Sequence, residues 1–188
     1  MKKRFAVLIT ILFAFLSGCS GGNDELDRAM ALRSRLVSCN GCTFDAEVTA
    51  DYEDKLYSFS MNCRADSAGN VAFTVTAPDS IAGITGTVSQ QGGTLTFDDT
   101  ALAFELLADG LFSPVSAPWI LIHTLQSGYL TSCAELDDGL LLSVDNSYEE
   151  DSLNLSIRLG SGDLPTEAEI SWQGRRILSL TVKNFAFQ

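Results

Sequence analysis

From residue 42 onwards the chain alternates apolar and polar residues, and this alternation constrains its fold more than any other feature. Successive side chains of a β-strand point to opposite faces, so a period of two predicts strands with one buried face. The alternating runs, separated by short turns, cover residues 42–49, 57–62, 71–75, 84–88, 95–97, 102–106, 140–144, 153–159, 168–172 and 177–187. Tight connections between short strands favour an antiparallel sheet.

Two stretches break the alternation and predict helices. Residues 24–38 place acidic side chains in the first turn, where the helix dipole is positive, with Asn23 or Asp24 as the cap. The apolar side of this helix comprises Leu26, Ala29, Met30, Leu32 and Leu36. Within residues 114–130, apolar residues at spacings of three and four predict an amphipathic helix that covers part of the sheet. The predicted fold class is α+β, mainly β, with about 11 strands, an N-terminal helix and a central helix.

The two runs that flank the acidic turn at residues 51–54 form a hairpin, and its register follows from the apolar face that both strands share. The register pairs Val48 with Tyr57, Ala46 with Phe59 and Phe44 with Met61. It also sets Cys42 directly opposite Cys63. Directly opposed Cβ atoms lie about 4.5–5.5 Å apart, close to the span of a disulfide, so we predict a disulfide between Cys42 and Cys63.

Cysteine usage fits an exported chain, because four cysteines remain besides Cys19 and an even number favours disulfides. In this scheme Cys39 pairs with Cys133 by elimination. A bulge just before Cys42 would instead pair Cys39 with Cys63, and four reduced, buried thiols also fit the pattern. Cys39 and Cys42 lack both the second ligand pair of a zinc site and the βαβ setting of a thioredoxin-like site, so we expect no metal.

The N-terminus has the pattern of an export signal. Lys2, Lys3 and Arg4 precede an uncharged, mostly apolar run at residues 5–16. A membrane-spanning helix needs about 20 apolar residues, so this run is too short to span and is typical of a signal peptide. We therefore expect export of the chain, with cleavage close to residue 18.

The four residues Leu-Ser-Gly-Cys at 16–19 resemble the lipobox of bacterial lipoproteins. The resemblance implies a diacylglycerol on the thiol of Cys19, cleavage before it and acylation of the new amine. Two or three acyl chains hold a protein stably on a bilayer. The expected organisation is a signal peptide at 1–18, the lipidated cysteine with a short linker at 19–23, and one domain at 24–188. An ordinary signal peptide with an incidental cysteine is the alternative.

After removal of residues 1–18, the chain has nine basic against 24 acidic residues, a formal net charge of −15. Such a surface repels nucleic acid and anionic lipid head groups. We therefore expect no nucleic-acid partner, and we expect attachment to a membrane to depend on the lipid anchor. Solubility alone would explain the acidity, and an acidic binding surface is the alternative.

No residue pattern typical of an enzyme is present. The single histidine, His123, lies in the predicted central helix, and the chain contains no G-x-S-x-G, no H-E-x-x-H and no phosphate-binding glycine–lysine loop. Acidic pairs fall in turns, at residues 98–99 and 137–138. We therefore expect a non-enzymatic protein with no cofactor beyond the acyl chains on Cys19, and with His123 at a surface or interfacial position.

The order of elements (anchor, helix, about six strands, helix, about five strands) and the run FTVTAP at 73–78 resemble the LolA-like half-barrels of the lipoprotein-localisation-factor superfamily. The resemblance covers about residues 24–188. It implies a strongly curved sheet, half closed by helices, with an apolar concavity for acyl chains or a partner. The residues expected to line it are Phe44, Phe59, Met61, Phe73, Phe97, Phe104 and Trp119. A fully packed core would account for the same residues.

Two functions are compatible with this resemblance. In the first, a membrane-anchored extracytoplasmic lipoprotein binds lipid or lipoprotein acyl chains in the concavity. In the second, the same fold is a protein-interaction module that regulates an envelope or sporulation process and carries no lipid. Both place the domain on the outer face of the cell membrane, or on an outer membrane if the host has one. An open concavity favours lipid, whereas a filled core favours a protein partner.

Overall fold

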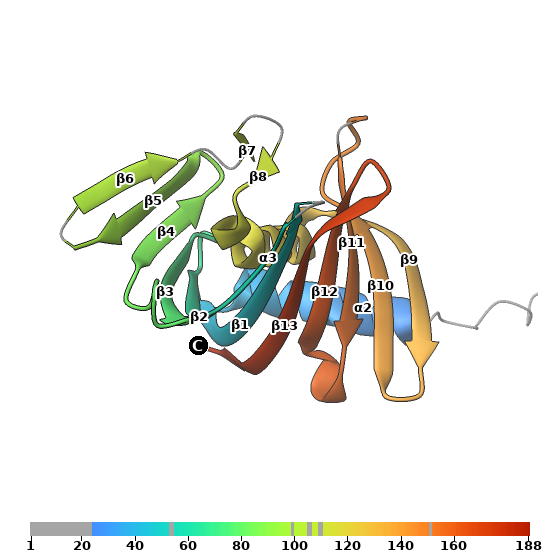
Figure 1. The fold of residues 1–188 in the computed structure, drawn as a ribbon. Helices are drawn as coiled ribbons and strands as arrows, with labels where there is room; N and C mark the ends of the chain where they lie inside the picture. The colour runs from blue at the N-terminus through green and yellow to red at the C-terminus, as the bar shows by residue number, and fades with distance from the viewer. Residues whose placement is uncertain (1–23, 53–54, 99, 105–106, 109–110, 151) are drawn as a thin grey trace, which may run out of the picture.

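The computed structural model describes residues 24–188 except 53–54, 99, 105–106, 109–110 and 151 (Figure 1). The expected signal peptide and Cys19 lie outside these residues, so the lipid anchor stays a prediction. Side chains of residues 107–108 and 111–112 are also outside the description.

Eleven strands form one open antiparallel sheet with two helices against it, and the predicted fold class is confirmed (Figure 1). The strands are β1 (Gly41–Tyr52), β2 (Lys55–Asp66), β3 (Val71–Ala77), β4 (Thr85–Ser89), β5 (Gly92–Phe97), β6 (Thr100–Phe104), β9 (Tyr129–Leu136), β10 (Gly139–Asp145), β11 (Leu153–Leu159), β12 (Pro165–Trp172) and β13 (Arg175–Phe187). Their order across the sheet is β6-β5-β4-β3-β2-β1-β13-β12-β11-β10-β9. Because β1 pairs with β13, the first and last strands meet near the middle.

Between β6 and β9 the chain leaves the main sheet. It forms a two-stranded hairpin, β7 (Leu107–Ala108) and β8 (Leu111–Phe112), which the alternation did not predict. A 3-10 turn, η1 (Pro114–Ser116), then leads into helix α3 (Ala117–Ser127). A second 3-10 turn, η2 (Ser161–Asp163), joins β11 to β12.

The hairpin register predicted from the sequence is wrong by two residues. Val48 pairs with Phe59, and Cys42 pairs with Ala65 instead of Cys63. The strands continue through the acidic stretch to Tyr52 and Lys55, which also pair, so the centre of the turn lies one residue later than expected. A shift of two keeps every side chain on its face, so the assignment of the buried face is correct.

Helix α2 spans Asp24–Ser38, as the sequence predicts. Its contact with the core is made by Ala29, Leu32 and Leu36, which are buried. Leu26 and Met30, which we expected on the same apolar side, are instead exposed to solvent. The helix therefore packs against the rest of the domain through a narrower stripe than its sequence suggests.

Arg33 connects the two helices. Its Nε donates a hydrogen bond to the carbonyl oxygen of Leu125 at 2.9 Å, and its Nη2 donates to that of Gly128 at 2.8 Å. These carbonyls belong to the last turn of α3 and the residue after it, where helix acceptors lack intrahelical donors. A cationic side chain there also complements the helix dipole, so the contact fixes α2 against α3.

Helix α3 is buried on nearly every side, and the expectation of a one-sided amphipathic helix is wrong. Eight of its 11 residues are buried, and it contacts α2, β2, β10 and β13. An apolar helix without a polar face is stable only inside a core. Together the two helices occupy the inner side of the sheet over its central strands.

Candidate binding surface on the open end of the sheet

Most of the residues expected to line a concavity are packed in the core. Phe44, Met61 and Phe73 are buried on the inner side of β1, β2 and β3, and Trp119 is buried within α3. Phe59 is half-buried and packs against the core. The helices therefore cover the inner side of the central strands. Of the expected residues, only Phe97 and Phe104, at the β6 end of the sheet, reach an open surface.

We call strands β4, β5 and β6 the wing. Figure 1 shows the wing extending beyond α3, at the opposite end of the sheet from β9. On the side of the sheet that carries the core, the wing presents Leu95, Phe97, Leu102 and Phe104. Phe97 is 51% exposed and Leu102 is 60% exposed, while Leu95 and Phe104 are half-buried. We call these four residues the inner face of the wing.

Two glycines join this inner face to the core. A Cβ atom on Gly86 would lie 2.6 Å from Cζ of Phe73, and one on Gly93 would lie 2.3 Å from Cζ of Phe104. The aromatic rings therefore lie over the glycine backbones, in contacts that a larger residue would displace. Because Gly86 pairs with Leu95 and Leu95 with Leu102, the apolar surface continues from Phe73 across the wing.

The outer face of the wing carries other kinds of side chain than the inner face. It carries small hydroxyl and methyl side chains. A shallow hollow of about 580 Å³ is lined by Thr87, Thr94 and Ala103 of this face and also by Phe104. Strand β6 forms one edge of the main sheet, so its outward backbone groups have no partner strand in the part of the chain that the structure describes. Such an edge is a site where an extended segment of another chain can pair.

A smaller hollow of about 270 Å³ lies between α3, the turn from β4 to β5 and the segment between β10 and β11. His123 lines it and stacks on Trp119, with ring centroids 4.7 Å apart. Desolvation lowers the pKa of His123, so the imidazole is neutral at pH 7. Its Nε2 lies 3.4 Å from the Ser127 hydroxyl, and no carboxylate among the described residues is hydrogen-bonded to it. Among the described residues, His123 therefore contacts the Ser127 hydroxyl and the Trp119 ring.

Thr124 lines the same hollow. The residue is buried, and its Oγ1 has no hydrogen-bond partner among the described residues. The hollow has room for a water molecule beside Oγ1 of Thr124. Neither a charged nor a nucleophilic group completes a site there within the described residues.

The cysteines are distributed in two places. Cys42 and Cys63 lie on the inner face of adjacent strands as diagonal neighbours, since Cys63 pairs with Phe44. Diagonal Cα atoms lie about 7–8 Å apart in a regular sheet, slightly beyond the usual span of a disulfide. The argument from direct opposition is therefore wrong, and the bond itself stays a prediction that requires a small approach of the two strands.

Burial controls the chemistry of these thiols. It raises the pKa of Cys42 to about 12, with the nearby Cys39 thiol adding to the effect, and it also raises the pKa of Cys63. A thiol is nucleophilic only as thiolate, so both groups are inert at neutral pH while reduced.

The pairing of Cys39 with Cys133 does not fit this fold. Sγ of Cys133 contacts the carbonyl oxygen of Glu25 at 3.3 Å, whereas Sγ of Cys39 contacts that of Leu36 at 3.4 Å. Those two carbonyls lie at opposite ends of α2, about 16 Å apart along its axis. The elimination argument failed because it took no account of the helix between the two cysteines.

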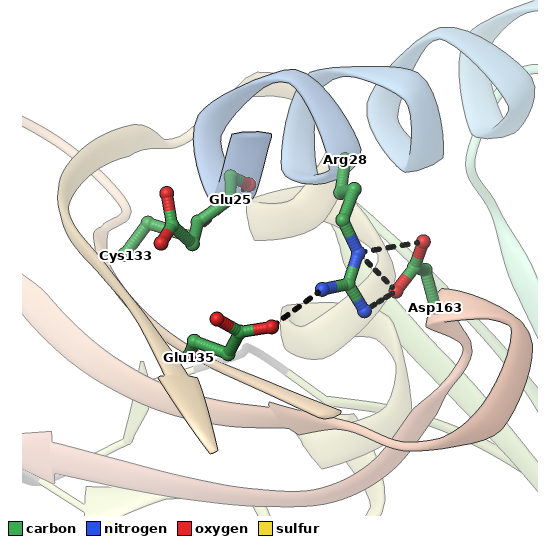
Figure 2. A network of polar contacts seen from close by, with 5 residues as sticks. All are labelled: Glu25, Arg28, Cys133, Glu135 and Asp163. Carbon is green, nitrogen blue, oxygen red and sulfur yellow. Dashed lines mark hydrogen bonds and ion pairs between the residues drawn. The ribbon is translucent and has the colours of Figure 1, made fainter. Parts of the chain in front are cut away.

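The N-terminal end of α2 is held by a polar network (Figure 2). Arg28 donates from Nη2 to Oδ1 of Asp163 at 2.6 Å and from Nε to the same oxygen at 3.1 Å. Nη1 of Arg28 lies 3.7 Å from a carboxylate oxygen of Glu135. The network links α2 to η2 and to β9, and all its charged groups are partly exposed. Its geometry therefore indicates a structural connection between three elements.

Within the described ranges, no group of three or more His, Cys, Asp or Glu side chains could hold a metal ion. Among the helices of the same ranges, neither α2 nor α3 is long and apolar enough to cross a membrane.

No protein-family model and no curated protein matches the sequence. Among solved structures, the chain is similar to an uncharacterized conserved protein from Thermus thermophilus, with 14% identity and a TM-score of 0.47 over 88% of this chain and 86% of that one. It is also similar to a LolA superfamily protein from Nitrosomonas europaea, with 9% identity and a TM-score of 0.43 over 85% and 93%. A third is the Mycobacterium tuberculosis lipoprotein LppX, with 8% identity and a TM-score of 0.41 over 88% and 96%.

The resemblance noted in the sequence is thus found again among solved structures, which include a LolA superfamily protein. At these identities and TM-scores the likeness assigns neither a ligand nor an activity to this chain. The functional argument therefore depends on the chain's own surface.

Proposed function

We propose that this protein is an exported, non-enzymatic lipoprotein that is anchored through Cys19 and binds acyl chains on the inner face of the wing. The observation that carries the proposal is the exposed apolar surface formed by Phe97 and Leu102, continuous with Leu95 and Phe104. Apolar surface of this kind, at the border of a packed core, is where a soluble domain takes up an apolar ligand.

The geometry of the wing fits a thin, flexible ligand. Gly86 and Gly93 carry no side chain where the rings of Phe73 and Phe104 lie over the backbone, so the rings lie close to the sheet, and Thr100, opposite Phe97, adds one hydroxyl to this side. Each methylene that such a surface removes from water contributes about 0.8 kcal/mol. Contact with about five methylenes therefore gives roughly 4 kcal/mol, which corresponds to weak, exchangeable binding near the millimolar range.

Acyl-chain binding is tested with the mature chain carrying Cys19→Ser, which removes the expected anchor and leaves the wing unchanged. Native mass spectrometry with a short-chain fatty acid added at millimolar concentration should detect the bound molecule, and a fluorescent fatty acid should bind with a saturable signal. If neither is observed, the acyl-chain function is wrong.

Binding of a protein partner is a second function, and a specific observation favours it. The inner side of the central strands is filled by α2 and α3, and β6 leaves an edge open for strand pairing. In that case the same wing would bind a segment of another envelope protein. The segment would pair with β6 and add one strand to the sheet. A fatty acid would then fail to compete with the partner.

The anchor is tested separately. Cys19→Ala should release the domain from the membrane or leave an uncleaved precursor, because the acyl chains are its expected attachment. Retention of a correctly processed Cys19→Ala protein on the membrane would contradict the anchor.

A further inference from the structure

Helix α2 exposes a row of large apolar side chains on a flank next to its buried side. Leu26 is 40%, Met30 is 46% and Val37 is 60% exposed. Positions spaced by four and seven share one face of a helix. These three residues, which we call the outer stripe, lie beside the buried positions Ala29, Leu32 and Leu36, about 100° from them around the helix axis.

The position of α2 in the chain brings this stripe close to a membrane. Only four residues, 20–23, separate Cys19 from the first residue of the helix. Five residue steps span at most about 18 Å. If Cys19 carries the anchor, as the proposed function states, α2 cannot move further than this from the bilayer surface.

The charges around the stripe decide what kind of contact it makes. Arg33, the nearest basic side chain on the helix, is engaged with the backbone oxygens of Leu125 and Gly128. Asp24 and Asp27 lie in the first turn of α2. Electrostatic attraction to anionic lipids therefore does not drive contact between the stripe and a membrane. The driving force is insertion of its apolar side chains into the bilayer.

We propose that the outer stripe of α2 lies on the bilayer to which the chain is anchored, with Leu26, Met30 and Val37 at the boundary between head groups and acyl chains. The inference rests on the lipid anchor of the proposed function. The anchor holds the helix near the surface, and the stripe sets the orientation of the domain on it.

The methionines of the mature chain provide the test. Met30 lies in the outer stripe, and Met61, the only other methionine after residue 18, is buried in the core. The lipidated protein is reconstituted in vesicles of saturated phosphatidylcholine and treated with hydrogen peroxide, and oxidation of each methionine is followed by peptide mapping. The Cys19→Ser chain with the same vesicles is the matched control, and flotation measures membrane attachment.

Oxidation of Met30 should be about fivefold slower or more in the floating lipidated protein than in the Cys19→Ser chain, because insertion to about 5–10 Å removes the thioether from water. Met61 should stay unoxidised in both, which reports a folded core. Equal oxidation of Met30 in a protein that floats overturns the docking and leaves the anchor intact. A lipidated chain that fails to float refutes the anchor and the docking together. Protection of Met30 in Cys19→Ser without vesicles assigns the stripe to self-association and also overturns the inference.

Discussion

Replacing Leu102 by serine tests whether the inner face of the wing binds the ligand. The side chain is 60% exposed and its removal leaves no cavity, so the free energy of unfolding should change by less than about 0.5 kcal/mol. Full burial of a leucine side chain gives about 1.5–3 kcal/mol. A ligand that covers the exposed 60% therefore gains about 1–2 kcal/mol from this residue, and its loss should raise the Kd about 5- to 30-fold.

Leu56→Ser is the matched control, because Leu56 is 69% exposed but lies on β2 close to the tip of the β1–β2 hairpin. Titration with a fluorescent fatty acid should show weaker binding only for Leu102→Ser, while thermal unfolding shows equal Tm values for both variants. The reasoning is refuted if the two substitutions weaken binding equally, or if Leu102→Ser binds as tightly as the unchanged chain.

Three further outcomes are expected. Non-reducing peptide mapping of the exported protein should recover Cys42 linked to Cys63, a loop of about 20 residues that would add roughly 3 kcal/mol; a free Cys42 peptide would contradict it. Leu36→Ala should lower the free energy of unfolding in urea by about 2–5 kcal/mol, because Leu36 is buried, whereas Leu26→Ala should change it by less than about 0.5 kcal/mol. With reductant present, the free energy of unfolding should fall as the pH rises from about 9 to 12. Burial raises the pKa of Cys42 from 9.0 to about 12, so this thiol loses its proton at a lower pH in the unfolded chain than in the folded one. The fall should be smaller in Cys42→Ala.

The sequence predicted the faces of the strands but not their register. The alternation of apolar and polar residues predicts which side chains share a face. A shift of two residues in the pairing leaves every side chain on the same face. The pairing of Cys42 with Ala65 depends on where the hairpin turns, and the acidic residues at 51–54 allow more than one centre. The faces of β1 and β2 were therefore predictable, whereas the contact between two cysteines was not.

The extent of the open surface could not be read from the sequence either. Phe73 and Phe97 occur in similar alternating runs, yet one is buried and the other exposed. The difference follows their places in the sheet, because Phe73 on β3 lies next to β2, which α3 contacts, whereas Phe97 on β5 lies next to the edge strand β6. Residues 117–127 contain no Asp, Glu, Lys or Arg, and this absence of charge along a whole helix is the sequence signal for its burial.

The central claim, that acyl chains bind on the inner face of the wing, is tested most directly by photo-crosslinking. A fatty acid with a diazirine near its methyl end is bound to the Cys19→Ser chain, irradiated and mapped by mass spectrometry after digestion. Adducts should concentrate in β5 and β6, at residues 92–104, and an excess of unlabelled fatty acid should suppress them. Adducts confined to β9–β12, or labelling that unlabelled fatty acid does not reduce, would contradict the claim.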